Sequence, residues 1–401
     1  MMLSVLSARE QHKLQNIRRR MQWYVDRKHI PCCSYVLAKS GHIIDQQYLG
    51  FSDRGARMAL TDESIFRIHS LTKLIVSVAA MLLVERGKIS LDSPISNVIP
   101  GFAKLRVLMA HATSIDQTEA LQRPVTLRHL LSHTAGFSYG FIDPTTLIDR
   151  HYLDNGLNLL NPYEGDLRTF VDSVIQFPIA FQPGTHWRYS VATDIVGYII
   201  ECVSGQSLDA FLRRNLFEPL GMTNTGFYVA PEKRHLVVSL AQANDMYRPM
   251  ETGYSESPIE AAAPLVESPK FMSGGGGLYS TAYDYLNFMQ LIEARGMWCG
   301  EQIIRRQTLE EMLVGQLPPG IGLKFPMWQL PGVDFGLGFA LKARESETPG
   351  SIGHYFWGGM AGTHSWVFDN GIVALCMTQM MPSFLHPFSD DFEKLVSQLS
   401  I

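Results

Sequence analysis

A serine and a lysine three residues apart, Ser70 and Lys73, are the pair in this sequence best suited to covalent chemistry. A serine hydroxyl is a weak nucleophile until a neighbouring base takes its proton. Lysine can be that base when burial and nearby cations lower its pKa. Residues 70–86 contain no glycine or proline and predict a helix that ends at Gly87. Side chains three residues apart project from one face of a helix, so both groups can reach one reacting atom.

The predicted helix is expected to lie inside the protein. Residues 74–84 are apolar apart from Ser77, and a helix that is apolar all round is normally enclosed by its domain. The start of a helix also presents N–H groups and a positive dipole end where an oxyanion could form. Serine and lysine recur at this spacing by chance, so an alternative stays open in which Ser70 only caps the helix and Lys73 is solvated.

The composition indicates a globular protein with a large core. The chain has 401 residues, 46% hydrophobic and 18% charged, enough for one large two-part enzyme or two to three modest domains. A net charge of −4 gives no reason to expect nucleic acid or an anionic membrane as partner. Five scattered cysteines favour a reducing compartment, and no run approaches the roughly 20 apolar residues of a membrane span. We therefore expect a cytoplasmic protein.

Strand patterns occur at both ends of the chain. Residues 33–38 and 43–50 predict two strands joined at Ser40-Gly41, and Asp369-Asn370-Gly371 is a strong hairpin signal near the other end. Further short strands are predicted at 336–341, 351–356, 363–368 and 372–377. A closing helix is expected at about 388–400.

These patterns predict an α/β (α+β) fold with one antiparallel sheet built from both termini and flanked by helices. Residues 1–87 and 330–401 would form the domain that contains the sheet. Residues 88–329 would form a mostly helical inserted domain with loops that make the walls of a pocket.

Three other motifs are expected to carry no chemistry. Residues 274–277 are four glycines, a flexible turn that lacks the lysine and hydroxyl of a phosphate loop. Residues 136–140 match Gly-x-Ser-x-Gly but lack the strand that a nucleophile elbow needs. His129 and His133 have the spacing of a zinc pair, without the glutamate or a third ligand, so we expect no metal site.

Several further blocks make the sequence similar to the serine β-lactamase and penicillin-binding-protein superfamily. It most resembles the class C β-lactamases and the family VIII carboxylesterases, from the first hairpin to the last helix. The blocks are Leu130-Leu131-Ser132-His133-Thr134-Ala135-Gly136, Phe181-Gln182-Pro183-Gly184, Tyr189-Ser190, Gly274-Gly275-Gly276-Gly277-Leu278, Phe335-Gly336-Leu337-Gly338 and Trp357-Gly358-Gly359. The resemblance implies a β-lactamase/transpeptidase-like fold.

The resemblance also assigns catalytic roles to three residues. Ser70 matches the nucleophile that is acylated, and Lys73 matches its partner on the helix. Tyr189 matches the tyrosine of a Tyr-x-Asn motif. A phenol beside an ammonium has a lowered pKa and can shuttle the serine proton.

Two positions depart from the β-lactamase pattern. Val191 stands where β-lactamases usually carry an asparagine that binds the substrate amide. Trp357-Gly358-Gly359 replaces Lys-Thr-Gly, so the lysine that helps anchor a substrate carboxylate is missing. Both departures favour neutral esters over anionic amides. The resemblance implies that the N–H groups of Ser70 and Met360 hold the oxyanion. The residues expected to contact substrate are Tyr139, Val191, Trp357, Gly358 and Gly359.

The resemblance therefore implies a serine esterase for small, largely apolar carboxylic esters that needs no metal or organic cofactor. The expected partner is a small-molecule ester, with neither nucleic acid nor membrane. A β-lactamase or D,D-peptidase, an acyltransferase, and a catalytically silent scaffold of the same fold remain alternatives. The sequence leaves the natural substrate and the oligomeric state open.

Overall fold

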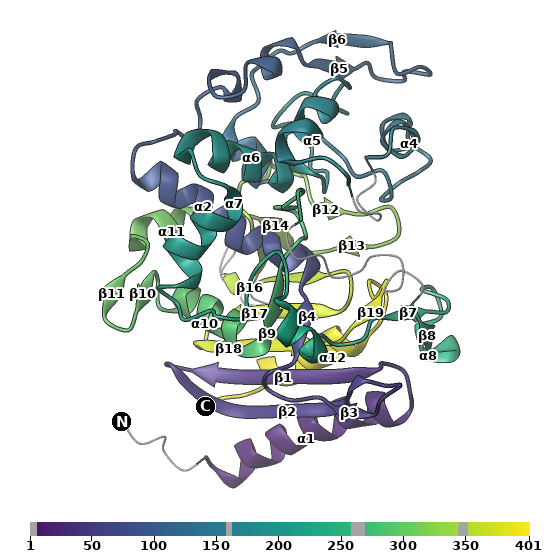
Figure 1. Ribbon diagram of the computed structural model, residues 1–401, viewed down its shortest axis with the longest axis vertical. Helices are drawn as coiled ribbons and strands as arrows, with labels where there is room; N and C mark the ends of the chain where they lie inside the picture. Colours follow the sequence, from purple (N-terminus) through teal and green to yellow (C-terminus); the bar gives the residue numbers. More distant parts are fainter. Residues whose placement is uncertain (1–5, 158–162, 258–268, 344–351) are drawn as a thin grey trace.

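An eight-stranded antiparallel sheet forms the centre of the computed structural model, which describes residues 6–157, 163–257, 269–343 and 352–401 (Figure 1). The strand order is β14-β15-β16-β17-β18-β1-β2-β3. The bounds are β1 Cys32–Lys39, β2 His42–Asp53, β3 Met58–Ala59, β14 Val333–Phe335, β15 Ala340–Ala343, β16 Ile352–Gly359, β17 Thr363–Phe368 and β18 Ile372–Met377. Both ends of the chain build this sheet, as the strand patterns predict.

Alternate residues of the central strands face two separate hydrophobic clusters, as the period of two in a strand requires. On β1, Cys33 and Tyr35 pack in one cluster with α1 (Ala8–Asp26) and α12 (Phe388–Ser397). Cys32 and Val36 point to the opposite face and join the main core. Helix α10 (Ala282–Glu293) covers that face. The sheet is therefore a middle layer between two sets of helices.

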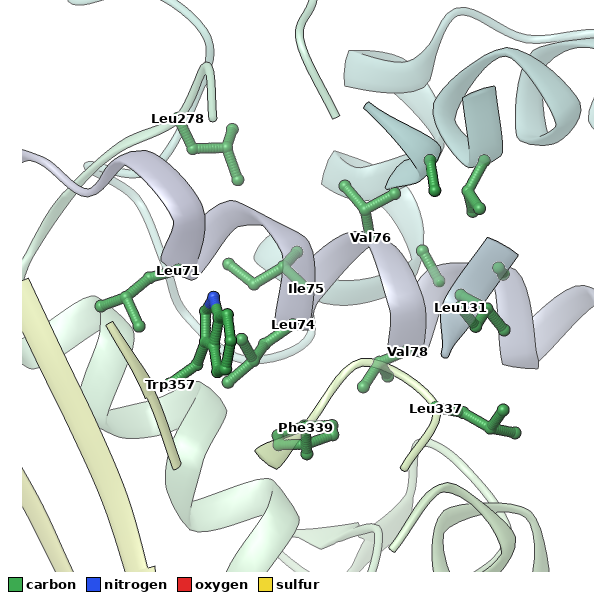
Figure 2. Packing of buried hydrophobic residues seen from close by; sticks show 14 of the residues in the cluster. Leu71, Leu74, Ile75, Val76, Val78, Leu131, Leu278, Leu337, Phe339 and Trp357 are labelled. Carbon is green, nitrogen blue, oxygen red and sulfur yellow. The ribbon is translucent and has the colours of Figure 1, made fainter. Parts of the chain in front are cut away.

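The helix predicted from Ser70 is present and enclosed. It starts as a 3₁₀ turn, His69–Leu71, and continues as α2, Thr72–Glu85. All residues of α2 from Thr72 to Leu83 are buried. Figure 2 shows Trp357 and Phe339 beside this helix, in the core that the sheet shares with it.

The turn before Ser70 is fixed by neighbours that are remote in sequence. The Thr363 hydroxyl of β17 donates to the Ile68 carbonyl at 3.0 Å. The Ile68 N–H donates to the Leu278 carbonyl at 3.1 Å, and the Tyr285 hydroxyl donates to the Leu71 carbonyl at 2.9 Å. The start of α2 is thereby held against the end of the sheet.

The region between the two sheet segments contains most of the remaining elements. Its helices are α3 Leu127–Leu131, α4 Leu147–Asp154, α5 Leu167–Val174, α6 Ala192–Ser204, α7 Leu208–Leu212, α8 Pro249–Thr252 and α11 Arg306–Met312. Its short strands are β5 Arg106–Leu108, β6 Thr118–Ala120, β7 Ala241–Ala243, β8 Tyr254–Glu256, β9 Tyr279–Thr281, β10 Met297–Trp298, β11 Glu301–Gln302, β12 Leu323–Lys324 and β13 Gln329–Leu330. Two further short strands from outside this region, β4 Ile65–Arg67 and β19 Met380–Met381, pair with β9 and β7. In Figure 1, α4, α5 and α6 lie on the side of α2 away from the sheet.

The structure differs from one predicted strand and leaves the predicted domain division untested. The strand predicted at 336–341 is wrong over 336–339, because these residues connect β14 to β15, and only its last two residues belong to a strand. Gly338 has a φ of +99°, which favours glycine and a turn. The division into 1–87 with 330–401 and 88–329 stays a prediction, and α10 packs on the sheet although it belongs to the predicted insertion.

Among the described residues no single helix is long and apolar enough to cross a membrane. One bent pair, α6 and the helical segment Leu208–Phe217, has the required length and composition only when the two helices are taken together.

Replacing Thr363 by valine should weaken the attachment of the Ser70 turn. The substitution keeps the shape of the buried side chain and leaves the Ile68 carbonyl without its hydroxyl donor. The Ile68 carbonyl still accepts from the Leu71 N–H at 3.1 Å, so the substitution removes only the net contribution of one hydrogen bond, about 0.5–1.5 kcal/mol. The free energy of unfolding, measured by urea titration, should fall by about that amount. An unchanged midpoint with an unchanged slope would contradict this role of the hydroxyl.

The buried histidine His386 should make stability depend on pH. Burial lowers the pKa of His386 to about 4, so the folded state stays neutral at pH values where the unfolded chain binds a proton. This contribution is complete above about pH 6.5 and is lost as the pH falls towards 4, by up to about 1.4 kcal/mol per pH unit. The free energy of unfolding of His386→Asn should fall less steeply over this interval. Parallel slopes in the two proteins would contradict the assignment.

Candidate active site

Ser70 and Lys73 lie together at the start of α2, as their spacing predicts. Lys73 Nζ is 3.4 Å from Ser70 Oγ, and the lysine side chain is only 2% exposed. The amine also donates to the Gly275 carbonyl at 2.6 Å and meets the Tyr139 hydroxyl at 2.8 Å. A carbonyl can only accept, so the first N–H is committed to Gly275. An uncharged amine that gives its second N–H to Tyr139 has its lone pair left for the proton of Ser70.

Tyr189 reaches the same lysine with its ring. Lys73 Nζ lies 4.6 Å from the centroid of that ring, a cation–π distance. The Tyr189 hydroxyl oxygen accepts a hydrogen bond from Trp357 Nε1 at 3.1 Å. An indole N–H is only a donor, so this contact leaves the phenol proton of Tyr189 available to another acceptor. The structure therefore brings the three predicted catalytic residues together, and their roles stay predictions.

Tyr139 differs from the expectation that it only lines the pocket. It lines the cavity, and its hydroxyl also makes the 2.8 Å contact with Lys73. Burial, followed by the nearby Asp194 and Tyr189, raises the pKa of Tyr139 well above its ordinary value. The phenol beside Lys73 is therefore a neutral hydroxyl. The sequence resemblance pointed to Tyr189 for this contact and missed Tyr139, which lies three residues beyond the Leu130–Gly136 block.

The four consecutive glycines allow a close approach between the loop and α6. A Cβ on Gly274 would stand 2.5 Å from the Thr193 carbonyl oxygen. A Cβ on Gly275 would overlap an oxygen of Asp194 and lie 2.9 Å from the Tyr139 hydroxyl oxygen. The turn predicted to be flexible is thus packed on both sides, and glycine there lets the Gly275 carbonyl reach Lys73.

The end of β16 lies beside the nucleophile. Gly358, Gly359 and Met360 line the same cavity as Ser70, and a Cβ on Gly359 would overlap the Ile68 carbonyl oxygen. This close packing agrees with a strand end that faces the reacting carbonyl. The role of the Ser70 and Met360 N–H groups as oxyanion donors stays a prediction.

Val191 does not take the place predicted for it. The residue is fully buried at the N-terminus of α6 and is absent from the cavity wall among the described residues. Its N–H donates to the Ser138 carbonyl at 3.2 Å. The expectation that Val191 contacts substrate is therefore wrong, because the side chain points into the core of the helical region.

A cavity of about 620 Å³ opens in front of Ser70. Its walls are mainly aromatic and apolar, with contributions from Phe141, Tyr163, Phe271, Phe325, Trp328, Phe356 and Phe384. Phe325 and Trp328 stack at 4.3 Å between ring centroids, and Trp328 stacks on Phe384 at 5.1 Å. The cavity has the size of sites that take drug-sized molecules.

The charges of the cavity wall disfavour anionic ligands. Arg67 is the one lysine or arginine among the described lining residues, and its guanidinium donates to the Val238 carbonyl at 3.1 Å. The acidic residues Asp390 and Glu393 lie in the same wall. A carboxylate-bearing substrate would therefore find weak attraction, in agreement with tryptophan at position 357.

The remaining motifs have structural roles. His133 Nδ1 is 3.3 Å from Ser190 Oγ, and its ring packs on Tyr189 at 4.8 Å between centroids. His129 Nδ1 accepts from the Thr126 N–H at 3.2 Å. Ser138 of the Gly-x-Ser-x-Gly match is buried and bonded to Arg188 and Asp149. In the described part of the chain no group of three or more His, Cys, Asp or Glu residues could hold a metal ion.

The chain is similar to known proteins along most of its length. A model of the Beta-lactamase family matches residues 15–396. Esterase EstB of Burkholderia gladioli is 30% identical over 355 residues, which cover 86% of this chain and 84% of the relative.

Two solved structures share the fold. EstCE1, described as a hydrolase with promiscuous acyltransferase activity, has a TM-score of 0.80 at 23% identity and covers 98% of this chain and all of its own. The penicillin-binding protein of Bacillus halodurans has a TM-score of 0.67 at 19% identity, with 95% and 99% of the two chains covered. The chain belongs to the Beta-lactamase family, as an enzyme of the serine hydrolase superfamily with a β-lactamase/transpeptidase-like fold.

Proposed function

We propose that the protein is a carboxylesterase that hydrolyses largely apolar carboxylic esters through an acyl-enzyme on Ser70. The observation that carries this proposal is the buried amine of Lys73, which faces Ser70 Oγ at the floor of an aromatic cavity. The relationship to an esterase supports it. No step needs a metal or an organic cofactor.

Acylation begins with proton transfer from Ser70 to Lys73. As Oγ bonds to the ester carbonyl carbon, its proton moves to Nζ, whose other hydrogens are bonded to Gly275 and Tyr139. The carbonyl oxygen takes the electron pair of the broken π bond. The Ser70 and Met360 N–H groups are the donors we assign to this oxyanion.

Tyr189 is the proton donor that we assign to the leaving alcohol. Its oxygen already accepts from Trp357, so its own O–H is available when the C–O bond of the ester breaks. The ammonium of Lys73, which lies over the ring of Tyr189, then returns a proton towards the phenolate. Water attacks the acyl-enzyme with the same proton transfers in reverse, releasing the acid and restoring Ser70.

The cavity sets the substrate class. Its aromatic walls favour apolar acyl and alcohol groups, and its volume admits esters larger than the small ones suggested by the sequence. The tryptophan at 357 replaces a charged anchor with an N–H that is already bonded to Tyr189. These features support esters over β-lactams and peptide termini.

An acyltransferase is the second candidate, since the acyl-enzyme can pass its acyl group to an alcohol in place of water. The apolar lining favours an apolar alcohol as acceptor, and EstCE1 is described with such an activity. A rise in ester product when a primary alcohol is added at millimolar concentration would favour this alternative. A cephalosporin turned over faster than simple esters would favour a β-lactamase.

Replacing Ser70 by alanine should abolish turnover of p-nitrophenyl butyrate. Without the nucleophile the acyl-enzyme cannot form, and we expect kcat/KM to fall by about 10³-fold or more. A fluorophosphonate probe should label the wild type and not the variant, as read by mass spectrometry of the peptide that contains residue 70. Equal rates in the two proteins would end the assignment.

Removing the hydroxyl of either active-site tyrosine should slow the reaction at a different step. Tyr139→Phe removes the hydroxyl that accepts from Lys73, and we expect kcat/KM to fall by about 10- to 100-fold. Tyr189→Phe removes the proposed acid, and we expect kcat/KM to fall by about 10²- to 10⁴-fold. Leaving groups of low pKa need no acid, so the Tyr189 defect should shrink with p-nitrophenyl esters relative to alkyl esters. Tyr355→Phe on β16, bonded to Arg295, serves as the control, and an equal loss there would contradict both roles.

A further inference from the structure

A buried carboxylate that the mechanism above does not use lies behind the glycine loop. Asp194, in the first turn of α6, is fully buried. One of its oxygens, Oδ1, accepts from the Ser273 hydroxyl at 2.6 Å and from the Gly275 N–H at 3.0 Å. Within the described part of the chain Oδ2 has no hydrogen-bond partner. Burying a carboxylate in this way is costly unless a charge nearby compensates it.

Gly275 connects this carboxylate to the catalytic amine. Its N–H donates to Asp194, and its carbonyl accepts from Lys73 at 2.6 Å. The position that a Cβ on Gly275 would occupy overlaps Asp194 Oδ2 and lies 2.9 Å from the Tyr139 hydroxyl oxygen. The carboxylate and the phenol therefore face each other across a gap that only glycine leaves open.

Two histidines near Lys73 carry no charge at neutral pH. Burial, assisted by the charge of Lys73, lowers the pKa of His133 well below its ordinary value. Burial, followed by the charges of Arg67 and Lys73, lowers the pKa of His69 to about 4. Tyr139 is a neutral phenol, and Tyr189 presents its ring face. Burial raises the pKa of Asp194, and the charge of Lys73 opposes that rise.

We propose that Asp194 is a positioning residue whose negative charge, acting through the Gly275 loop, stabilises Lys73 as an ammonium when it takes the Ser70 proton. The inference rests on the proposed function, because it assigns Lys73 as the base. The carboxylate also holds Ser273 and Gly275, so the loop carbonyl stays aimed at the amine. Asp194 touches no reacting atom, and its effect passes through Lys73.

The sign of the effect follows from the charge. A nearby carboxylate favours the ammonium, so its removal lowers the pKa of Lys73 and makes it a weaker base. Acylation on the pH plateau then slows, while the enzyme keeps its active uncharged amine down to lower pH. We therefore expect a lower plateau of kcat/KM together with a shift to lower pH of the acid limb, the part of the pH profile where activity falls with falling pH. Loss of packing alone does not produce this combination.

The test is the pH dependence of kcat/KM for p-nitrophenyl butyrate in Asp194→Asn, which keeps the shape and an acceptor oxygen. We expect a fall of about 10- to 100-fold on the plateau and an acid limb about one pH unit lower. Asp284→Asn is the matched control, since Asp284 is also buried, accepts from the Asn224 N–H at 2.6 Å and the Thr225 hydroxyl at 2.9 Å, and lies in α10. That control should keep the wild-type limb.

A second variant covers the case in which Asp194→Asn fails to fold. Ser273→Ala removes a donor that favours the ionised form of Asp194. A smaller fraction of Asp194 then carries the negative charge, so the acid limb of the pH profile should shift in the same direction by a smaller amount. A wild-type limb in the folded variants, whether or not the plateau falls, would overturn the proposal while Ser70→Ala remains inactive. Activity in Ser70→Ala would instead defeat the proposed function itself.

Discussion

The burial of one lysine amine is the constraint on which the rest of the site depends. Lys73 is enclosed at the start of a helix that is buried on every side, and its hydrogen-bond partners are neutral oxygens. These contacts hold two hydrogens of the amine and keep Nζ 3.4 Å from Ser70 Oγ. The packing of α2 against the sheet and the loop that brings the Gly275 carbonyl to the amine hold Lys73 in this position.

The departures from the β-lactamase pattern form a consistent set in the structure. Trp357 takes the position of a charged anchor and bonds to the oxygen of Tyr189, which leaves the phenol proton available. Its indole also packs in the core beside α2 (Figure 2). In the proposed mechanism this one residue offers no charge to an anionic substrate and supports Tyr189 as the proton donor. The aromatic walls, among them Phe325, extend the same preference across the cavity.

The sequence patterns of neighbouring residues predicted much of the fold and of the site. The residues that they did not predict are brought to the site by contacts between distant segments of the chain. The hairpin of β1 and β2 and the pair Ser70 and Lys73 depend on neighbours in sequence, where periodicity and turn residues are informative. Tyr139 reaches Lys73 from 66 residues away, and no local rule selects it over Tyr189. Asp194 had one signal in the sequence, an acidic residue directly before the apolar residues Ile195 and Val196 of α6. The prediction for Val191 was wrong because the motif indicates where the backbone of this residue lies. It does not indicate the direction of an apolar side chain that is smaller than the usual asparagine.

In the proposed mechanism Ser70 carries the acyl group while Lys73 holds the serine proton. Acylation is measured by rapid mixing with a p-nitrophenyl ester whose acyl-enzyme is hydrolysed slowly, followed by acid quench and mass spectrometry. We expect a burst of one p-nitrophenolate per active site and an acyl mass increment on the peptide that contains Ser70. Both should form much more slowly in Lys73→Met. A burst of unchanged rate in that variant, or an acyl group on any other residue, would contradict the proposed mechanism.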